Sequence, residues 1–154
     1  MTTTNDSGQA LLEIALCLSL LMLLVMGTMD VGYLFSTKLT LQNAVRQAGR
    51  YAITGQCITG SDGTCSESRY NSVIQTAKDA SLGLLTTSEI TLACGDNGGG
   101  CPNSAGGPGD TVTITVTYPY HFMTAEIAAF FPHNFYTITV SATFTNEMFP
   151  PSES

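Results

Sequence analysis

Positively charged residues are scarce in this chain of 154 residues, which has five Lys and Arg against twelve Asp and Glu and a net charge of −7. Nucleic acid is therefore not an expected partner, because phosphate backbones are bound mainly by clustered Lys and Arg. No polybasic run favours anionic lipid either. The first thirty residues contain no Lys or Arg, so an ordinary secretory signal peptide, which begins with a basic region, fits poorly.

Catalytic motifs are also missing. The sequence has no nucleophile-elbow serine, no HExxH, no Walker loop and no glycine-rich dinucleotide turn. Its two histidines, His121 and His133, are not spaced as metal ligands on one helix face. We expect no catalytic residue, no cofactor and no metal site. A membrane-attached enzyme remains a rival interpretation, and it would need side chains that only the fold brings together.

One long apolar stretch dominates the N-terminal part of the chain. Ala10 to Met29 is a run of twenty residues, and at about 1.5 Å per residue a helix of this length crosses the ~30 Å hydrocarbon core of a bilayer. We therefore predict a transmembrane segment at about residues 10–29. A signal anchor that is never processed is the competing interpretation.

Glu13 is the one charged side chain in this stretch. A carboxylate at the centre of a bilayer costs roughly 2.5–3.5 kcal/mol, so a partner or a role is expected for it. If a peptidase cuts after Gly8, the new amine on Gln9 lies one helical turn before Glu13 on the same face. The helix dipole also favours a carboxylate near the helix start.

A short polar leader ending in Gly, followed by an apolar helix with Glu at its fifth position, resembles a type IV prepilin. The string is more similar still to the TadE-like pseudopilins of tight-adherence (Tad/Flp) pilus systems. The residues that match the N-terminal pattern of that family are Gly8, Ala10, Glu13, Ala15, Gly27, Asp30, Gly32 and Phe35. The stretch LQNAVRQAGRYA at 41–52 resembles the helical stretch that follows in the family.

This resemblance implies a minor pseudopilin that is stored in the bacterial inner membrane and takes part in pilus assembly or priming, or in adhesion at the filament tip. It implies processing between Gly8 and Gln9 by a prepilin peptidase, and a role for Glu13 in assembly. Other pilin and pseudopilin subunits and an inner-membrane assembly platform are the implied partners. A membrane-anchored extracytoplasmic binding or adhesion module that never joins a filament is the alternative.

Four of the five cysteines lie outside the apolar stretch, in loops rich in Gly and Ser: Cys57, Cys65, Cys94 and Cys101. An even number in such loops favours two disulfides and an oxidising compartment. Zinc is the competing interpretation, but no C-x2-C spacing is present. Three connectivities are possible, and we favour the two local pairs, Cys57 with Cys65 and Cys94 with Cys101.

The orientation of the chain in a membrane is subject to two opposing arguments. The positive charges nearest the apolar stretch, Lys38, Arg46 and Arg50, all follow it, and the positive-inside rule alone would keep the C-terminal domain in the cytoplasm. The cysteines and the resemblance favour export. Because the basic residues are few and spread along a helix, we predict a single-pass protein with its C-terminal domain outside the cytoplasm, which can also enter the extracellular pilus.

Helical periodicity continues beyond the apolar stretch. Apolar residues recur on one face at Leu34, Leu41, Val45, Ala48 and Ala52. We expect this helix to end near Thr54, with Gly55 as a left-handed cap. A second helix is predicted at 67–84, capped by Ser66 or Asp62.

Alternating apolar and polar residues predict three short strands, at 88–94, 111–118 and 136–145. The connection between the last two is apolar and aromatic, and Thr124 is expected to cap a short helix within it. This connection is interpreted either as a lid on the sheet or as a contact surface for a partner subunit or a membrane. The candidate contact residues are Phe122, Ile127, Phe130 and Phe131.

Together these elements predict an α+β, pilin-like fold: a long N-terminal helix packed on a small three-stranded antiparallel sheet with a second helix. We expect a leader peptide at 1–8, the long helix at 9–54, an exported α+β domain at 55–149 and a disordered tail at 150–154.

Overall fold

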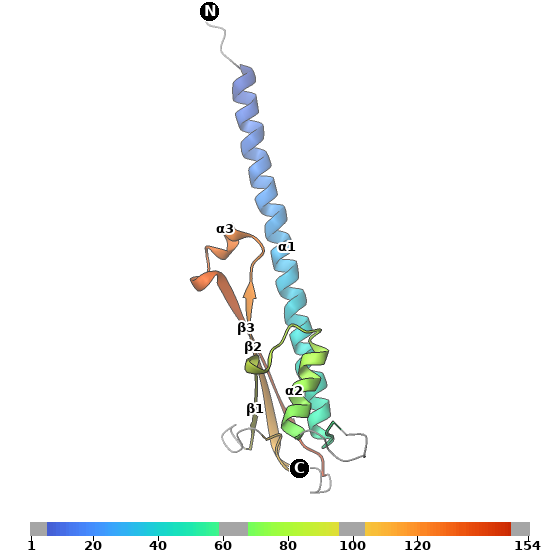
Figure 1. The fold of residues 1–154 in the computed structure, drawn as a ribbon. Helices are drawn as coiled ribbons and strands as arrows, with labels where there is room; N and C mark the ends of the chain where they lie inside the picture. The colour runs from blue at the N-terminus through green and yellow to red at the C-terminus, as the bar shows by residue number, and fades with distance from the viewer. Residues whose placement is uncertain (1–5, 59–67, 96–103, 149–154) are drawn as a thin grey trace, which may run out of the picture. The chain divides into compact units, whose positions relative to one another are not determined.

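The computed structural model describes residues 6–58, 68–95 and 104–148 (Figure 1). The elements follow in the order α1 (Asp6–Ile53), α2 (Arg69–Ala80), the 3-10 helix η1 (Thr87–Glu89), β1 (Ile90–Cys94), β2 (Thr111–His121), α3 (Ala125–Ala128), the 3-10 helix η2 (Pro132–Asn134) and β3 (Phe135–Thr145). The predicted α+β class is confirmed. The expectations for residues 1–5, for Cys65 and Cys101, and for the tail at 150–154 lie outside the described residues.

α1 is one helix of 48 residues. Leu41, Val45, Ala48 and Ala52 of its predicted apolar face are buried, whereas Leu34 is only half-buried. The helix ends at Ile53, and Gly55 follows with a φ of 69°. A left-handed φ favours glycine, which is why the sequence predicts the end of this helix well.

α2 is shorter than the predicted helix at 67–84, and the predicted cap is wrong. Ser68 is the N-cap, and its hydroxyl accepts a hydrogen bond from the backbone N–H of Asn71. The helix stops at Ala80 because Leu82 and Gly83 have φ values of 58° and 80°, which no helix can continue through. Its apolar residues Val73, Ile74 and Ala77 are buried.

The three strands form a sheet in the order β1-β2-β3. β1 pairs antiparallel with β2 in a register that places Ile90 opposite Val116 and Leu92 opposite Ile114. All four of these side chains are buried, as the alternation predicts. β2 runs to His121, three residues beyond the predicted strand at 111–118.

The chain divides into two compact units. The helix unit comprises residues 1–35 and 121–136, and the core unit comprises residues 36–120 and 137–154. The apolar side chains that are buried in the described chain all belong to the core unit. In Figure 1, α2 lies against the C-terminal part of α1 within that unit.

Arg69, at the start of α2, is a polar group at the centre of the core unit. The residue is 5% exposed, and its guanidinium donates hydrogen bonds to the carbonyl oxygens of Ala52 and Gly106. Ala52 lies in the last turn of α1, where backbone carbonyls have no partner within the helix. The Arg69 side chain therefore links α2 to the main chain of α1 at Ala52 and to the main chain at Gly106.

Candidate functional site

The N-terminal part of α1 exposes nearly all of its apolar side chains. Leu11 and Leu20 are each 69% exposed, and Leu24 is 61% exposed. An 18-residue window of this helix has a mean hydropathy of 2.5, so the helix is long and apolar enough to cross a membrane. Apolar surface of this extent is stable only when lipid or another protein covers it.

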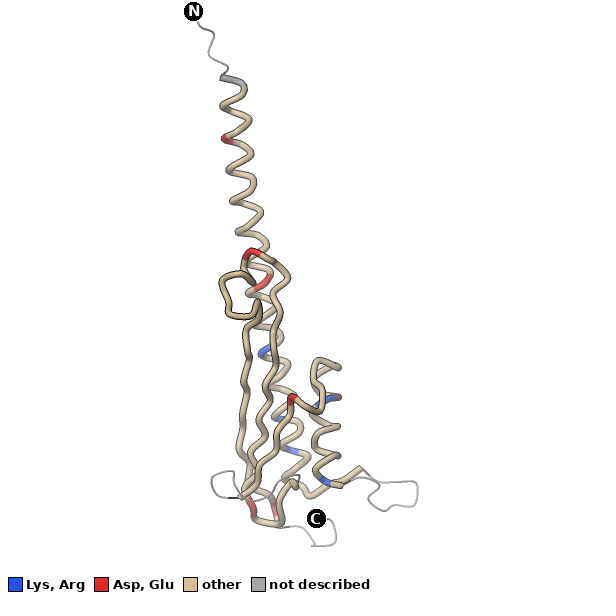
Figure 2. The backbone as a smooth tube through the Cα atoms, turned by 60° about the vertical axis from the view of Figure 1, so that its left-hand side comes forward, with Lys and Arg blue, Asp and Glu red and all other residues tan. Residues whose placement is uncertain are grey.

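Glu13 lies on one open face of this helix. The face is lined by Ala10, Glu13, Ile14, Cys17, Leu18 and Leu21. Residues 9 and 13 both belong to α1 and are one turn apart. Figure 2 shows no Lys or Arg on this part of the helix, and the first cationic side chain along the chain is Lys38. Glu13 therefore lacks a cationic side chain within reach on its own helix.

Asp30 follows the apolar span directly and is buried, with 1% of its surface exposed. Its two carboxylate oxygens accept hydrogen bonds from the backbone N–H groups of Met123 and Thr124, each at 3.0 Å. These residues begin the connection between β2 and β3, 93 and 94 positions further along the chain. Asp30 thus holds the β2–β3 connection, residues 122–134, against α1 within the helix unit.

The TadE-like family model matches residues 8–50. This segment is TadE-like. The matched family is the one that the sequence pattern resembles, and the match covers residues 8–50 of the 154. In the two other comparisons, neither a curated protein nor a solved structure matched the chain.

The TadE-like segment, residues 8–50, contains Gly8, Gln9, Glu13 and Asp30. Gly8 and Gln9 lie in the first turns of α1, and a Cβ atom added to Gly8 would meet no atom within 4 Å. In the sequence, Asp30 was recognised only as one of the residues that match the N-terminal pattern of the TadE-like family. An acidic residue next to an apolar span with no cation nearby is the signal that could have pointed to its role.

The pKa of Asp30 lies below its ordinary value. Burial by itself raises the pKa, but the Thr124 hydroxyl and the backbone N–H groups of Met123 and Thr124 donate to the carboxylate and lower it more. Hydrogen bonds to the charged form favour that form. Asp30 is therefore a carboxylate at neutral pH, and its charge is matched by oriented N–H and O–H dipoles.

Thr124 was expected to cap the short helix, and this prediction is wrong. Thr124 precedes α3, but its side chain makes no capping hydrogen bond. Its hydroxyl instead takes part in binding Asp30. A cap would need the hydroxyl oxygen to accept from an N–H of α3, whereas here the hydroxyl donates its proton to the carboxylate.

The four candidate contact residues fall in different places. Phe122 and Phe131 stack on each other, with ring centroids 4.5 Å apart. Ile127 lies against α1, with its Cδ1 atom 3.4 Å from the position a Cβ would take on Gly27. Phe130 is 87% exposed. The structure thus leaves only one of these four side chains largely uncovered, and partner contact at all four remains a prediction.

The cysteines outside the TadE-like segment are described in part. Cys57 and Cys94 are disulfide-bonded. Cys65 and Cys101 lie outside the described residues, so the two local pairs remain a prediction. Cys17, within the segment, is free and exposed.

Histidine and carboxylate side chains form no cluster of three that could hold a metal ion in the described part of the chain. His121 and His133 each pack near the ring of Phe135, with centroid distances of 5.8 and 6.0 Å. Both histidines therefore have an aromatic neighbour, and neither is held with a nucleophile or a second titratable group by any described contact.

Proposed function

We propose that this protein is a minor pseudopilin of a Tad-type pilus. It is stored in the bacterial inner membrane by α1, with its C-terminal domain outside the cytoplasm, and then takes part in pilus assembly or priming, or in adhesion at the filament tip. The observation that carries this proposal is the coincidence of the TadE-like match at 8–50 with a helix whose apolar side chains are exposed.

The exposed helix supports both stages of this function. In storage, lipid covers the side chains between Ala10 and Met29. In a filament, the same side chains pack against the helices of other subunits. The open face around Glu13 presents residues at spacings of three and four, the spacing that helix–helix contacts use.

Processing between Gly8 and Gln9 by a prepilin peptidase is part of the proposal. Cleavage creates an amine on Gln9, one turn from Glu13. The described residues of the helix unit contain no Lys or Arg, so this amine, on the same or a neighbouring subunit, is the cation that Glu13 would meet. An amine from a neighbour would set the axial position of one helix against the next.

The experiment that tests the assembly role compares Glu13→Gln with wild type. The substitution keeps the size and removes the charge, so membrane insertion should persist. We expect loss of piliated cells and weaker co-purification with partner pilins. Glu126→Gln is the matched control, because it removes an exposed carboxylate from the same unit. Normal pili in the Glu13→Gln strain would show that this carboxylate is a tolerated polar residue.

Processing is tested by mass spectrometry of the N-terminus of protein extracted from membranes and from pili. We expect Gln9 as the first residue, and a Gly8→Val variant that keeps its leader, because a branched side chain replaces the small residue at the junction. Intact leader on protein from assembled pili would contradict processing. Unprocessed protein that never enters a filament would instead favour the membrane-anchored adhesion module.

A further inference from the structure

The β2–β3 connection lies beside the C-terminal end of the apolar span within the helix unit. Two independent contacts fix this place: the Asp30 carboxylate binds the N–H groups of Met123 and Thr124, and Ile127 packs toward Gly27. Both contacts fall on the last turn of the predicted span and the residue directly after it. The connection is therefore held where a membrane-crossing α1 leaves the hydrocarbon.

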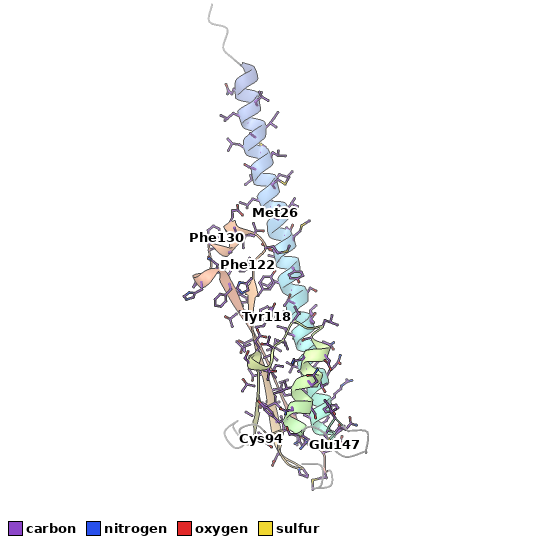
Figure 3. The ribbon with its side chains drawn as sticks, in the orientation of Figure 1. Met26, Cys94, Tyr118, Phe122, Phe130 and Glu147 are labelled. Atoms are coloured by element: carbon purple, nitrogen blue, oxygen red, sulfur yellow. The ribbon has the colours of Figure 1, made fainter. Side chains whose placement is uncertain are left out.

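A cleft of about 330 Å³ extends this contact along the helix. Thr124 and Glu126 of the connection line it together with Ser19, Met22, Leu23 and Met26 of α1. Ser19 precedes Asp30 by eleven residues, which is about 16 Å along a helix axis. The start of α3 thus lies beside the C-terminal half of the span, and Figure 3 labels Met26 on α1 and Phe122 and Phe130 on the connection.

The outer side chains of the connection are apolar and uncovered. Met123 is 79% exposed and Phe130 is 87% exposed. Moving such side chains out of water is favourable. This exposed surface belongs to the same unit as the exposed apolar side chains of the α1 span.

Charge on the connection is nearly absent. Between His121 and Tyr136 the sequence has one charged side chain, Glu126, and no Lys or Arg. A surface without cations has no electrostatic preference for anionic lipid. Aromatic side chains near the end of a membrane span are typical of the membrane–water interface.

We propose that the β2–β3 connection is a second membrane-contacting element, which inserts Phe130 and Met123 into the lipid interface at the C-terminal end of α1. The occupant of this apolar surface is phospholipid with zwitterionic headgroups. Asp30 sets the depth of insertion, because its hydrogen bonds tie the connection to the end of the span. The inference rests on α1 crossing a membrane and does not depend on assembly into a pilus.

Tryptophan fluorescence tests this directly, because the chain contains no Trp. The full chain carrying Phe130→Trp is reconstituted in phosphatidylcholine vesicles, with and without bromine on the acyl chains. We expect emission at short wavelength and loss of intensity with brominated lipid. Met148→Trp, at an equally exposed position of the core unit, is the matched control and should keep its intensity.

Three results would overturn the proposal. Emission typical of water from Phe130→Trp, unaffected by bromine, would place the connection in solvent. Emission at short wavelength that bromine leaves unchanged would mean that a second copy of this chain covers the residue. Failure of bromine to quench Leu20→Trp, within the span, would show that α1 itself is not in the bilayer, which would also remove the basis of the proposed function.

Discussion

Among the described residues of the helix unit the buried side chains are Asp30 and Thr124, both polar, whereas the core unit buries apolar side chains from α1, α2 and all three strands. The helix unit has no Lys or Arg, and all five of these residues belong to the core unit. The core unit therefore carries its own hydrophobic core. In the helix unit, hydrogen bonds to Asp30 hold the β2–β3 connection, and the apolar side chains of α1 stay exposed.

The largest expected effect is on the core unit, at Arg69. Arg69→Met removes the donors to the carbonyl oxygens of Ala52 and Gly106. Because hydrogen bonds to a charged group are worth roughly 1.5–3 kcal/mol each, we expect the free energy of unfolding to fall by about 3 kcal/mol. Urea unfolding in detergent, followed by circular dichroism, measures this.

Arg46→Met is the control for this change, since Arg46 is an exposed side chain of the same unit. It should alter the free energy of unfolding by less than about 0.5 kcal/mol. Equal losses from the two variants would mean that the main-chain contacts of Arg69 add nothing to stability.

A smaller effect is expected from two glycines of α1 that lie in different units. A Cβ on Gly49 would overlap the ring of Phe144, so Gly49→Ala should destabilise the core unit by about 1–3 kcal/mol. A Cβ on Gly32 would meet no atom within 4 Å, so Gly32→Ala should be neutral or stabilising by up to about 1 kcal/mol. The melting temperatures of the two variants show how closely other residues pack against α1 in each unit.

The double variant Gly49→Ala, Phe144→Leu separates the clash from other causes. A smaller side chain at residue 144 should restore part of the lost stability. Without any recovery, overlap with the ring would not explain the effect of Gly49→Ala.

In the helix unit the expected effect is local. Asp30→Asn leaves one acceptor oxygen for the two N–H donors of Met123 and Thr124. We expect hydrogen exchange at these two amides to accelerate, while the amide of Ile114 in the core unit keeps its protection. Glu126→Gln, an exposed change in the same unit, should leave all three amides unaltered.

The same contact predicts how protection of these two amides changes with pH. The pKa of Asp30 is lower in the folded chain than in the unfolded chain. The stability that the Asp30 carboxylate adds is therefore fully present above the unfolded pKa, and it is lost as pH falls through the folded pKa. Protection of the Met123 and Thr124 amides should decline in that acidic range after correction for intrinsic exchange. Protection that is constant with pH would rule out the carboxylate as the group that holds the connection.

The smallest expected effect is at the start of α2. Ser68→Ala removes the side-chain acceptor for the N–H of Asn71 and should cost about 1 kcal/mol. Ser68→Asp retains an acceptor and should cost less. Thermal unfolding measures both, and equal melting temperatures for Ser68→Ala and wild type would contradict the assignment of this cap.

The sequence by itself determined the elements whose signals are local. The run of apolar residues fixes α1, Gly55 fixes its end, and alternation fixes the inward faces of β1 and β2, because each depends on residues within a turn or along one strand. The TadE-like pattern is of the same kind, since it lies within α1. These are also the predictions that the fold and the family match confirm.

Only the tertiary structure decided the contacts between distant segments. Asp30 meets Thr124 across 94 positions, and Arg69 meets Gly106 across 37. Nothing next to Asp30 in the sequence distinguishes a residue that binds main-chain amides from a solvated carboxylate. Thr124 has a local role as a helix cap, but the fold brings its hydroxyl to the Asp30 carboxylate, and no capping bond forms. The hydrogen-bond partner of each of these side chains depends on which groups the fold brings close to it. A single sequence does not show which distant residues come that close.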